Sequence, residues 1–156
     1  MKLIVAIFLT AFLIQCSGSG EAQKASFNID ETLLKGSFTF YAEMAYPMRM
    51  RTRALNPPDQ LTVKGDTLTS SLSYFGQAQT VMQNHPGGVT FETTEFTRSV
   101  SKNEKGEWIV IFELQNEASA QQIIMTIYDN AQAMVTVTSL RRDRIQYRGY
   151  IRPGRG

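Results

Sequence analysis

The chain has 156 residues, which is enough for one domain, and it contains a single cysteine. Its 16 basic and 14 acidic residues give a net charge of +2, and a balance this close to neutral argues against nucleic acid as a partner. One cysteine excludes an intrachain disulfide, so the domain must depend on its core for stability.

The N-terminal segment predicts export. Met1 and Lys2 supply a short positive region, and residues 3–14 are apolar except for Thr10. An apolar run of this length matches the hydrophobic part of a signal peptide and is shorter than the ~20 residues of a membrane-spanning helix. We therefore expect residues 1–15 to form a signal peptide.

Cys16 follows this run directly. The sequence Leu13-Ile14-Gln15-Cys16 resembles a lipobox, although Gln15 stands where a small residue is usual. We expect residues 16–27 to be a lipidated cysteine and a flexible tether, because the segment after Cys16 is small and polar. The resulting prediction is an outer-membrane lipoprotein that faces the periplasm, with the membrane as a partner through the lipid. The alternative is ordinary cleavage within residues 17–20, which gives a soluble periplasmic protein.

Residues 28–156 predict a single β domain. A short helix is expected over residues 28–35, with Asp30 as its cap and Gly36 as its stop. From Gly36 onward apolar and polar residues alternate, the period of half-buried strands. The first strand ends at Pro47, and one of its faces carries Phe38, Phe40, Ala42 and Met44.

Further strands are expected in chain order, mostly joined by short hairpins. One of them contains Phe91 and Phe96, and a bulge between these two phenylalanines would account for their change of parity. About eight strands in this order predict an all-β antiparallel meander closed as a lipocalin-like barrel, with a two-sheet β-sandwich as the alternative. The remaining strands are expected around residues 61–63, 68–74, 108–114, 123–127, 131–137 and 145–151.

The residues suited to catalysis or metal binding are scattered. His85 is the sole histidine and stands in a loop-forming run, Asn84-His85-Pro86-Gly87-Gly88. A zinc or copper site would need several carboxylates beside it, and none has suitable spacing. Glu92 and Glu95 fall on opposite faces of a strand unless the bulge expected between Phe91 and Phe96 intervenes, and opposite faces do not suit acid–base catalysis. We expect no metal, no cofactor and no enzymatic activity.

Arginine and tyrosine residues give the candidate ligand site. Arg49, Arg51 and Arg53 occupy one loop, and the C-terminal arginines are able to clasp a carboxylate, a phosphate or the sugar acids of an envelope polymer. The alternative is a charged edge strand that resists aggregation. Aromatic residues with a polar tip suit a ligand mouth, although they equally suit a barrel core. The candidate ligand-binding residues are Tyr74, Phe75, Arg144 and Tyr147, and the C-terminal arginines are Arg141, Arg142, Arg144, Arg148, Arg152 and Arg155.

Several motifs occur in a specific order along the domain. They include Gly36-Ser37-Phe38-Thr39-Phe40, Leu72-Ser73-Tyr74-Phe75-Gly76, Gly87-Gly88-Val89-Thr90-Phe91 and the closing Arg144-Ile145, Tyr147 and Gly149. This order resembles the domain of unknown function 4251 family of exported, often lipid-anchored Bacteroidota proteins, from Gly36 to Pro153. Ser73 departs from the proline that the family commonly has there. The resemblance implies an envelope-located β domain and no activity.

Two functions follow as hypotheses. The first is a non-enzymatic, envelope-anchored binding or interaction module that holds a small apolar ligand in the barrel or docks an envelope protein partner. The second is an envelope hydrolase that uses carboxylate and arginine side chains, and it predicts a concave site with at least two convergent acids.

Overall fold

The computed structural model describes residues 25–76, 87–117 and 119–154. The predicted signal peptide, Cys16, His85 and Arg155 lie outside the described residues. One short helix and ten strands, all paired antiparallel, confirm the predicted all-β class. The elements are α1 (Ile29–Lys35), β1 (Ser37–Pro47), β2 (Arg53–Ala54), β3 (Gln60–Lys64), β4 (Thr67–Ser73), β5 (Gly88–Thr93), β6 (Phe96–Lys102), β7 (Trp108–Leu114), β8 (Gln122–Ile127), β9 (Gln132–Thr138) and β10 (Ile145–Pro153).

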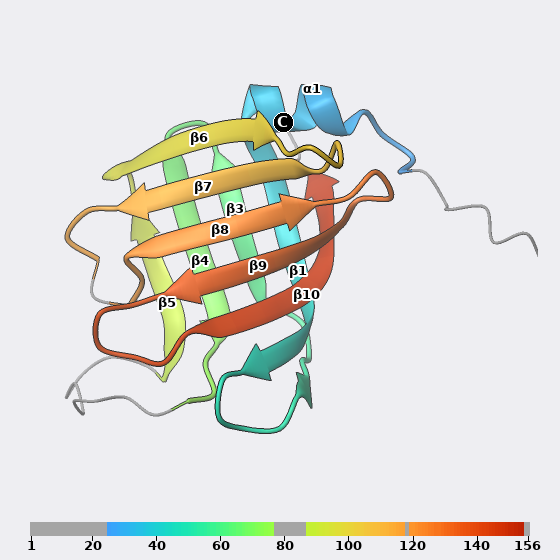
Figure 1. Cartoon of the computed structure of the whole chain (residues 1–156). Coiled ribbons are helices and arrows are strands. Elements are labelled where there is room, and N and C mark those ends of the chain that lie inside the picture. The colour runs from blue at the N-terminus through green and yellow to red at the C-terminus, as the bar shows by residue number, and fades with distance from the viewer. Residues whose placement is uncertain (1–24, 77–86, 118, 155–156) are drawn as a thin grey trace, which may run out of the picture.

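The strands form one sheet in the order β5-β4-β3-β1-β10-β9-β8-β7-β6, with β2 paired to β1. This order is the predicted meander, in which the last strand returns to pair with the first. The sheet curls into a half-barrel, and in Figure 1 strands β6 to β10 cross in front of β1, β3, β4 and β5. The two edge strands, β5 and β6, follow each other in the chain and are not paired in the described part of the protein.

Two features raise the expected eight strands to ten. The two-residue strand β2 has no sequence signature. The strand expected to run through Phe91 and Phe96 with a bulge is instead two strands, because β5 pairs with β4 and β6 pairs with β7 on the other half of the sheet. The chain changes halves at residues 94–95, where the Glu95 amide donates to Oγ1 of Thr93 at 3.0 Å.

A bulge does occur in β1, where the register shifts between Ala42 and Met44. Beyond the shift Ala45 points into the core and Met44 is only half-buried, so the predicted place of Met44 on the buried face is wrong. The opposing residue on β10 is Gly149. A Cβ atom there would lie 2.8 Å from the carbonyl carbon of Tyr41 and 3.0 Å from Cα of Ala42, so the β1–β10 seam requires glycine.

Apolar side chains from both halves of the sheet fill the interior of the half-barrel. They form one cluster that also includes Leu33 from the helix. The largest side chains that are fully buried are Tyr147, Phe38, Phe40, Phe112, Leu33, Leu61, Leu68, Leu72, Ile123, Met125, Ile127 and Ile145. The stability of the domain therefore comes from a packed interior, as expected for a chain without a disulfide.

Helix α1 covers one end of the half-barrel (Figure 1). Its N-cap is Asn28, whose side chain accepts a hydrogen bond from the Glu31 amide at 3.1 Å, so the predicted cap at Asp30 is wrong. Gly36 ends the helix in the left-handed conformation, as predicted. In the described part of the chain no helix is long and apolar enough to cross a membrane.

Candidate ligand cleft and arginine end

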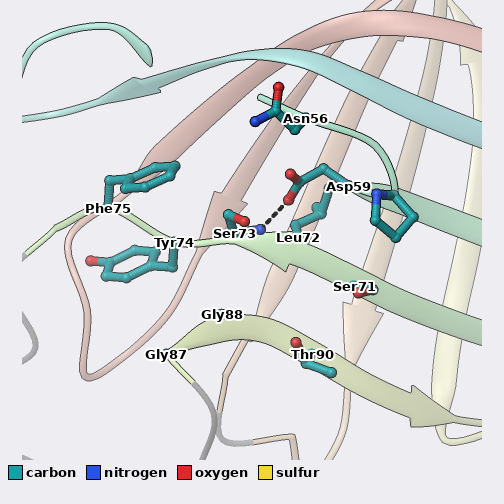
Figure 2. A pocket seen from close by; sticks show the side chains of 11 residues that line it. Asn56, Asp59, Ser71, Leu72, Ser73, Tyr74, Phe75, Gly87, Gly88 and Thr90 are labelled. Carbon is teal, nitrogen blue, oxygen red and sulfur yellow. Dashed lines mark hydrogen bonds between the residues drawn. The ribbon is translucent and has the colours of Figure 1, made fainter. Parts of the chain in front are cut away.

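An open cleft of about 450 Å³ lies at the end of the half-barrel opposite α1. It is bounded by the loop before β3, the last residues of β4 and the first residues of β5, as Figure 2 shows. Hydroxyl, amide, carboxylate and aromatic groups share its lining. The lining residues are Asn56, Pro58, Asp59, Ser71, Leu72, Ser73, Tyr74, Phe75, Gly87, Gly88 and Thr90.

Backbone contacts hold the loop wall of the cleft in place. The buried Asp59 carboxylate accepts a hydrogen bond from the Ser73 amide at the end of β4. The Asp59 carbonyl accepts another from the Ala42 amide of β1, at 2.9 Å. Because these bonds fasten the loop to two strands of the sheet, the cleft is pre-formed.

Two tyrosines support the aromatic side of the cleft. The Tyr147 hydroxyl donates to the Ser73 carbonyl at 2.9 Å, and the Tyr74 hydroxyl donates to the Asp143 carbonyl at 3.0 Å. Burial raises the pKa of Tyr147 well above its ordinary value, and burial together with the Asp143 charge raises the pKa of Tyr74. Both hydroxyls therefore remain protonated donors at neutral pH.

Two arginines lie against the aromatic rings of the cleft. The Arg142 guanidinium carbon is 5.2 Å from the Tyr74 ring centre, and Arg53 is 5.0 Å from that of Phe75. Nη1 of Arg142 also donates to the Gly88 carbonyl at 2.7 Å. These cation–π contacts orient both guanidinium groups beside the cleft.

The same end of the molecule gathers six arginines, which we call the arginine end: Arg49, Arg51, Arg53, Arg141, Arg142 and Arg144. The first three follow β1 and the other three precede β10, and Pro47 pairs with Ile145 where these strands meet the two loops. An ion pair joins the loops, with Nε of Arg49 3.7 Å from Oδ2 of Asp143. Sheet register therefore brings together two arginine groups that are far apart in the sequence.

The arginine end lies far from the point where the N-terminal segment enters the domain. The Ala25 amide donates to the Asp129 carbonyl in the turn before β9, at 3.2 Å, whereas Arg141, Arg142 and Arg144 follow the other end of β9. Figure 1 shows the first described residues beside α1 at the top and the loops of the arginine end at the bottom. The full length of the sheet separates them.

A family model described as Domain of unknown function (DUF4251) matches residues 21–151. The chain belongs to the DUF4251 family. A crystal structure of a DUF4251 family protein from Bacteroides eggerthii, at 1.95 Å resolution, is similar with a TM-score of 0.55 and 17% identity over 80% of this chain and 84% of that one. This likeness supports the DUF4251 fold alone. None of the curated proteins matches the chain.

The structure places the four candidate ligand-binding residues of this DUF4251 protein differently. Tyr74 and Phe75 line the cleft. Tyr147 is fully buried and donates a hydrogen bond to the Ser73 carbonyl of the cleft, so its ring belongs to the core. Arg144 is exposed and makes no ion pair or ring contact with any described residue. The structure therefore brings Tyr74, Phe75 and Tyr147 together and leaves Arg144 outside.

Sequence reasoning missed Arg142 and Asp59 as residues of the cleft. The sequence indicates Arg142 only as one of several C-terminal arginines, and nothing in a loop sequence shows which of them lies beside Tyr74. Asp59 follows two prolines that mark a loop, but its bond to Ser73 depends on the pairing of β3 with β4. Which of these residues reach the cleft is decided by strand pairing between distant parts of the chain.

Acidic groups are sparse in the cleft. Among the described lining residues Asp59 is the only carboxylate, and its Oδ1 already accepts from the Ser73 amide. Glu92 and Glu95 are exposed on β5 and on the turn after it. Within the described ranges no group of three or more His, Cys, Asp or Glu residues is placed to hold a metal ion.

Proposed function

We propose that this DUF4251 protein is a non-enzymatic binding module of the cell envelope, anchored through a lipid on Cys16, that takes a ligand in the cleft. The observation that carries the proposal is the pre-formed cleft at the end of the domain that lies away from the N-terminal tether. Side chains fill the inside of the half-barrel, so the surface is the better place for a ligand than the barrel interior.

The chemistry of the lining supports a small ligand with both a ring face and hydrogen-bonding groups. Tyr74 and Phe75 offer aromatic surface, and Asn56, Ser71 and Thr90 offer polar groups. Ligand sites in proteins generally combine apolar surface with a few polar groups of fixed position. This ligand is more polar than the small apolar molecule that a hollow barrel would hold.

The anchor and the cleft fit one orientation. A lipid on Cys16 would hold the tether side of the domain toward the membrane, and the cleft would then point away from it, toward the periplasm for an outer-membrane lipoprotein. The hydrolase alternative has less support, because acid–base cleavage of a glycosidic bond requires a second carboxyl group opposite Asp59.

Native mass spectrometry of the protein, purified from the envelope of its own host, tests the proposal. We expect a chain that begins at acylated Cys16 and carries a bound small molecule. Thr90→Trp places a large side chain in the cleft and should remove that molecule. Glu92→Trp is the matched control, since Glu92 lies on the same exposed face of β5 two residues farther along and does not line the cleft.

Three results would contradict the proposal in different ways. An unmodified chain that begins beyond Cys16 would remove the anchor and favour the soluble periplasmic alternative. A ligand that survives Thr90→Trp, or turnover of an envelope polymer by the purified protein, would overturn the cleft as a non-catalytic binding site.

A further inference from the structure

The arginine end concentrates positive charge in a chain that is nearly neutral. The two loops, residues 48–54 and 139–144, contain six arginines and one aspartate and carry a net charge of +5. The whole chain carries +2, so the rest of it is −3. A local field of this kind attracts anionic ligands more strongly than the net charge of the protein suggests.

The guanidinium groups of the arginine end are largely unneutralised. Arg49 lies 3.7 Å from Asp143, a distance beyond hydrogen-bonding range, and its side chain is 66% exposed. The side chains of Arg51, Arg141 and Arg144 make no ion pair with any residue in the described ranges. Such a group of exposed cations is electrostatically unfavourable for the isolated domain and is relieved when an anion binds.

Two of the six arginines are already oriented beside the cleft. The guanidinium carbons of Arg53 and Arg142 lie 5.0 Å and 5.2 Å from the ring centres of Phe75 and Tyr74. A guanidinium group has five N–H donors, so both arginines can still donate to oxyanions beside the rings. Arg142 uses Nη1 for the Gly88 carbonyl and keeps other N–H groups. At the cleft, aromatic rings and guanidinium groups therefore lie next to each other.

We propose that the arginine end and the cleft together bind a polysaccharide that carries repeated carboxylates. The six arginines are distributed over two segments, residues 48–54 and 139–144. Such a distribution suits several anionic groups spaced along a polymer. Tyr74 and Phe75 supply ring faces for the sugar units between them. This inference rests on the proposed function, because it assigns the ligand class of the same cleft.

The position of the arginine end favours a polymer over membrane lipid. Anionic lipid headgroups also match guanidinium chemistry. However, a domain held by a lipid on Cys16 has its tether at the α1 end, and the sheet separates that end from the arginine end. The arginines would then face away from the membrane that holds the protein.

Titration of the mature protein in detergent tests the ligand class. The probes are an oligogalacturonate, with one carboxylate on each sugar, an uncharged dextran oligomer of similar length, and glycerol phosphate as a lipid headgroup analogue. We expect the oligogalacturonate to bind about tenfold or more tightly than the other two probes, since several charge-assisted contacts form together. Its affinity should fall as salt is raised.

A charge-reversal pair locates the site. Arg51→Glu with Arg144→Glu should weaken oligogalacturonate binding about tenfold or more, because both residues are exposed and lose no partner in the fold. The control is Lys64→Glu with Lys105→Glu, which makes the same change of net charge at exposed positions, the last residue of β3 and the turn before β7, and should alter binding less than about twofold. Unchanged circular dichroism of both pairs excludes misfolding as the cause.

Three outcomes would overturn the inference. They are equal losses in the two charge-reversal pairs, equal binding of the uncharged dextran, and tighter binding of glycerol phosphate, which would assign the arginines to a phosphate headgroup. The Thr90→Trp variant separates this failure from that of the proposed function. If a native ligand leaves the Thr90→Trp protein while oligogalacturonate never binds, the cleft is a site and only its ligand class is wrong.

Discussion

The two ends of the half-barrel differ in whether their charged side chains are paired and their apolar side chains buried. At the α1 end Asp30 accepts a hydrogen bond from Nε1 of Trp108 at 2.8 Å and lies 3.5 Å from Nζ of Lys102, which in turn lies over the Trp108 ring. Leu33 is fully buried there. At the arginine end six cations share one aspartate, and the cleft stays open.

This difference separates the residues that stabilise the fold from those to which we assign ligand binding. The α1 end closes the core with a helix, and each of these charged groups has a partner. The arginine end keeps exposed cations that contribute little to folding, because isolated surface charges are worth little in water. Substitutions at the two ends should therefore have opposite consequences for the free energy of unfolding and for ligand binding.

The largest effect is expected from Leu33→Ala at the α1 end. Removal of a fully buried leucine side chain should lower the free energy of unfolding by about 2–5 kcal/mol, through lost apolar burial and the cavity left behind. Urea denaturation measures this change. Oligogalacturonate binding by the folded fraction should stay unchanged, and a parallel loss of affinity would show that the two ends are not independent.

Tyr147→Phe tests the connection between the core and the cleft. The Ser73 carbonyl loses its donor, and the free energy of unfolding should fall by about 1–2 kcal/mol at neutral pH. Phenylalanine keeps the ring, so the loss reports the hydroxyl group.

The same variant predicts a pH dependence. Because burial raises the pKa of Tyr147 in the folded state, the unfolded chain releases this proton first as the pH rises. The protonated Tyr147 hydroxyl therefore contributes fully to the free energy of unfolding below pH ~10. Above that pH this contribution is lost by up to about 1.4 kcal/mol per pH unit. Between about pH 9 and pH 11, the urea midpoint of unfolding should fall more steeply with pH in the wild type than in Tyr147→Phe. Equal slopes would contradict the assignment of this pH dependence to Tyr147.

Trp108→Phe should have a smaller effect at the α1 end. It removes the indole donor to Asp30 and keeps most of the ring that Lys102 contacts. We expect a loss of about 1 kcal/mol in the free energy of unfolding, since the bond is partly exposed. A loss as large as that of Leu33→Ala would mean that the polar contacts, rather than the buried leucine, hold the helix in place.

The smallest effect on stability is expected at the arginine end. Arg51→Gln and Arg144→Gln each remove an unpaired exposed charge and should change the free energy of unfolding by less than about 0.5 kcal/mol, toward greater stability as repulsion falls. Thermal unfolding at low salt is the best measurement of this small change in stability, because salt screens the repulsion between the arginines. A clear destabilisation by either variant would show that the arginines support the fold.

The sequence predicts the strands well where the signal is local. Alternation identifies the buried faces of β3, β7, β8 and β9, because neighbouring side chains in a strand point to opposite sides. The bulge in β1 was not predictable, since the register shift between Ala42 and Met44 depends on β10. The division of β5 from β6 was missed for a similar reason, because pairing with different halves of the sheet decides it.

The candidate site was predictable only in part. The sequence indicates Tyr74 and Phe75 because aromatic residues with a polar tip suit a ligand mouth, and both residues line the cleft. Arg142 could not be distinguished from Arg144 by sequence, since no periodicity applies within a loop. The meeting of the two arginine loops depends on the pairing of Pro47 with Ile145, two residues with no local relation in the chain.

The pairing of β1 with β10 gives assembly a direction. A ribosome, and any export channel that admits the N-terminus first, delivers β1 about 100 residues before β10, and so distant a contact forms slowly. Until β10 is available, the edge of β1 that pairs with it is exposed. The three arginines that precede β10 then have no fixed position relative to the three that follow β1. The proposed binding surface is thus the last part of the protein to form. A chain that lacks only its final strand should keep the earlier hairpins and show no binding of oligogalacturonate.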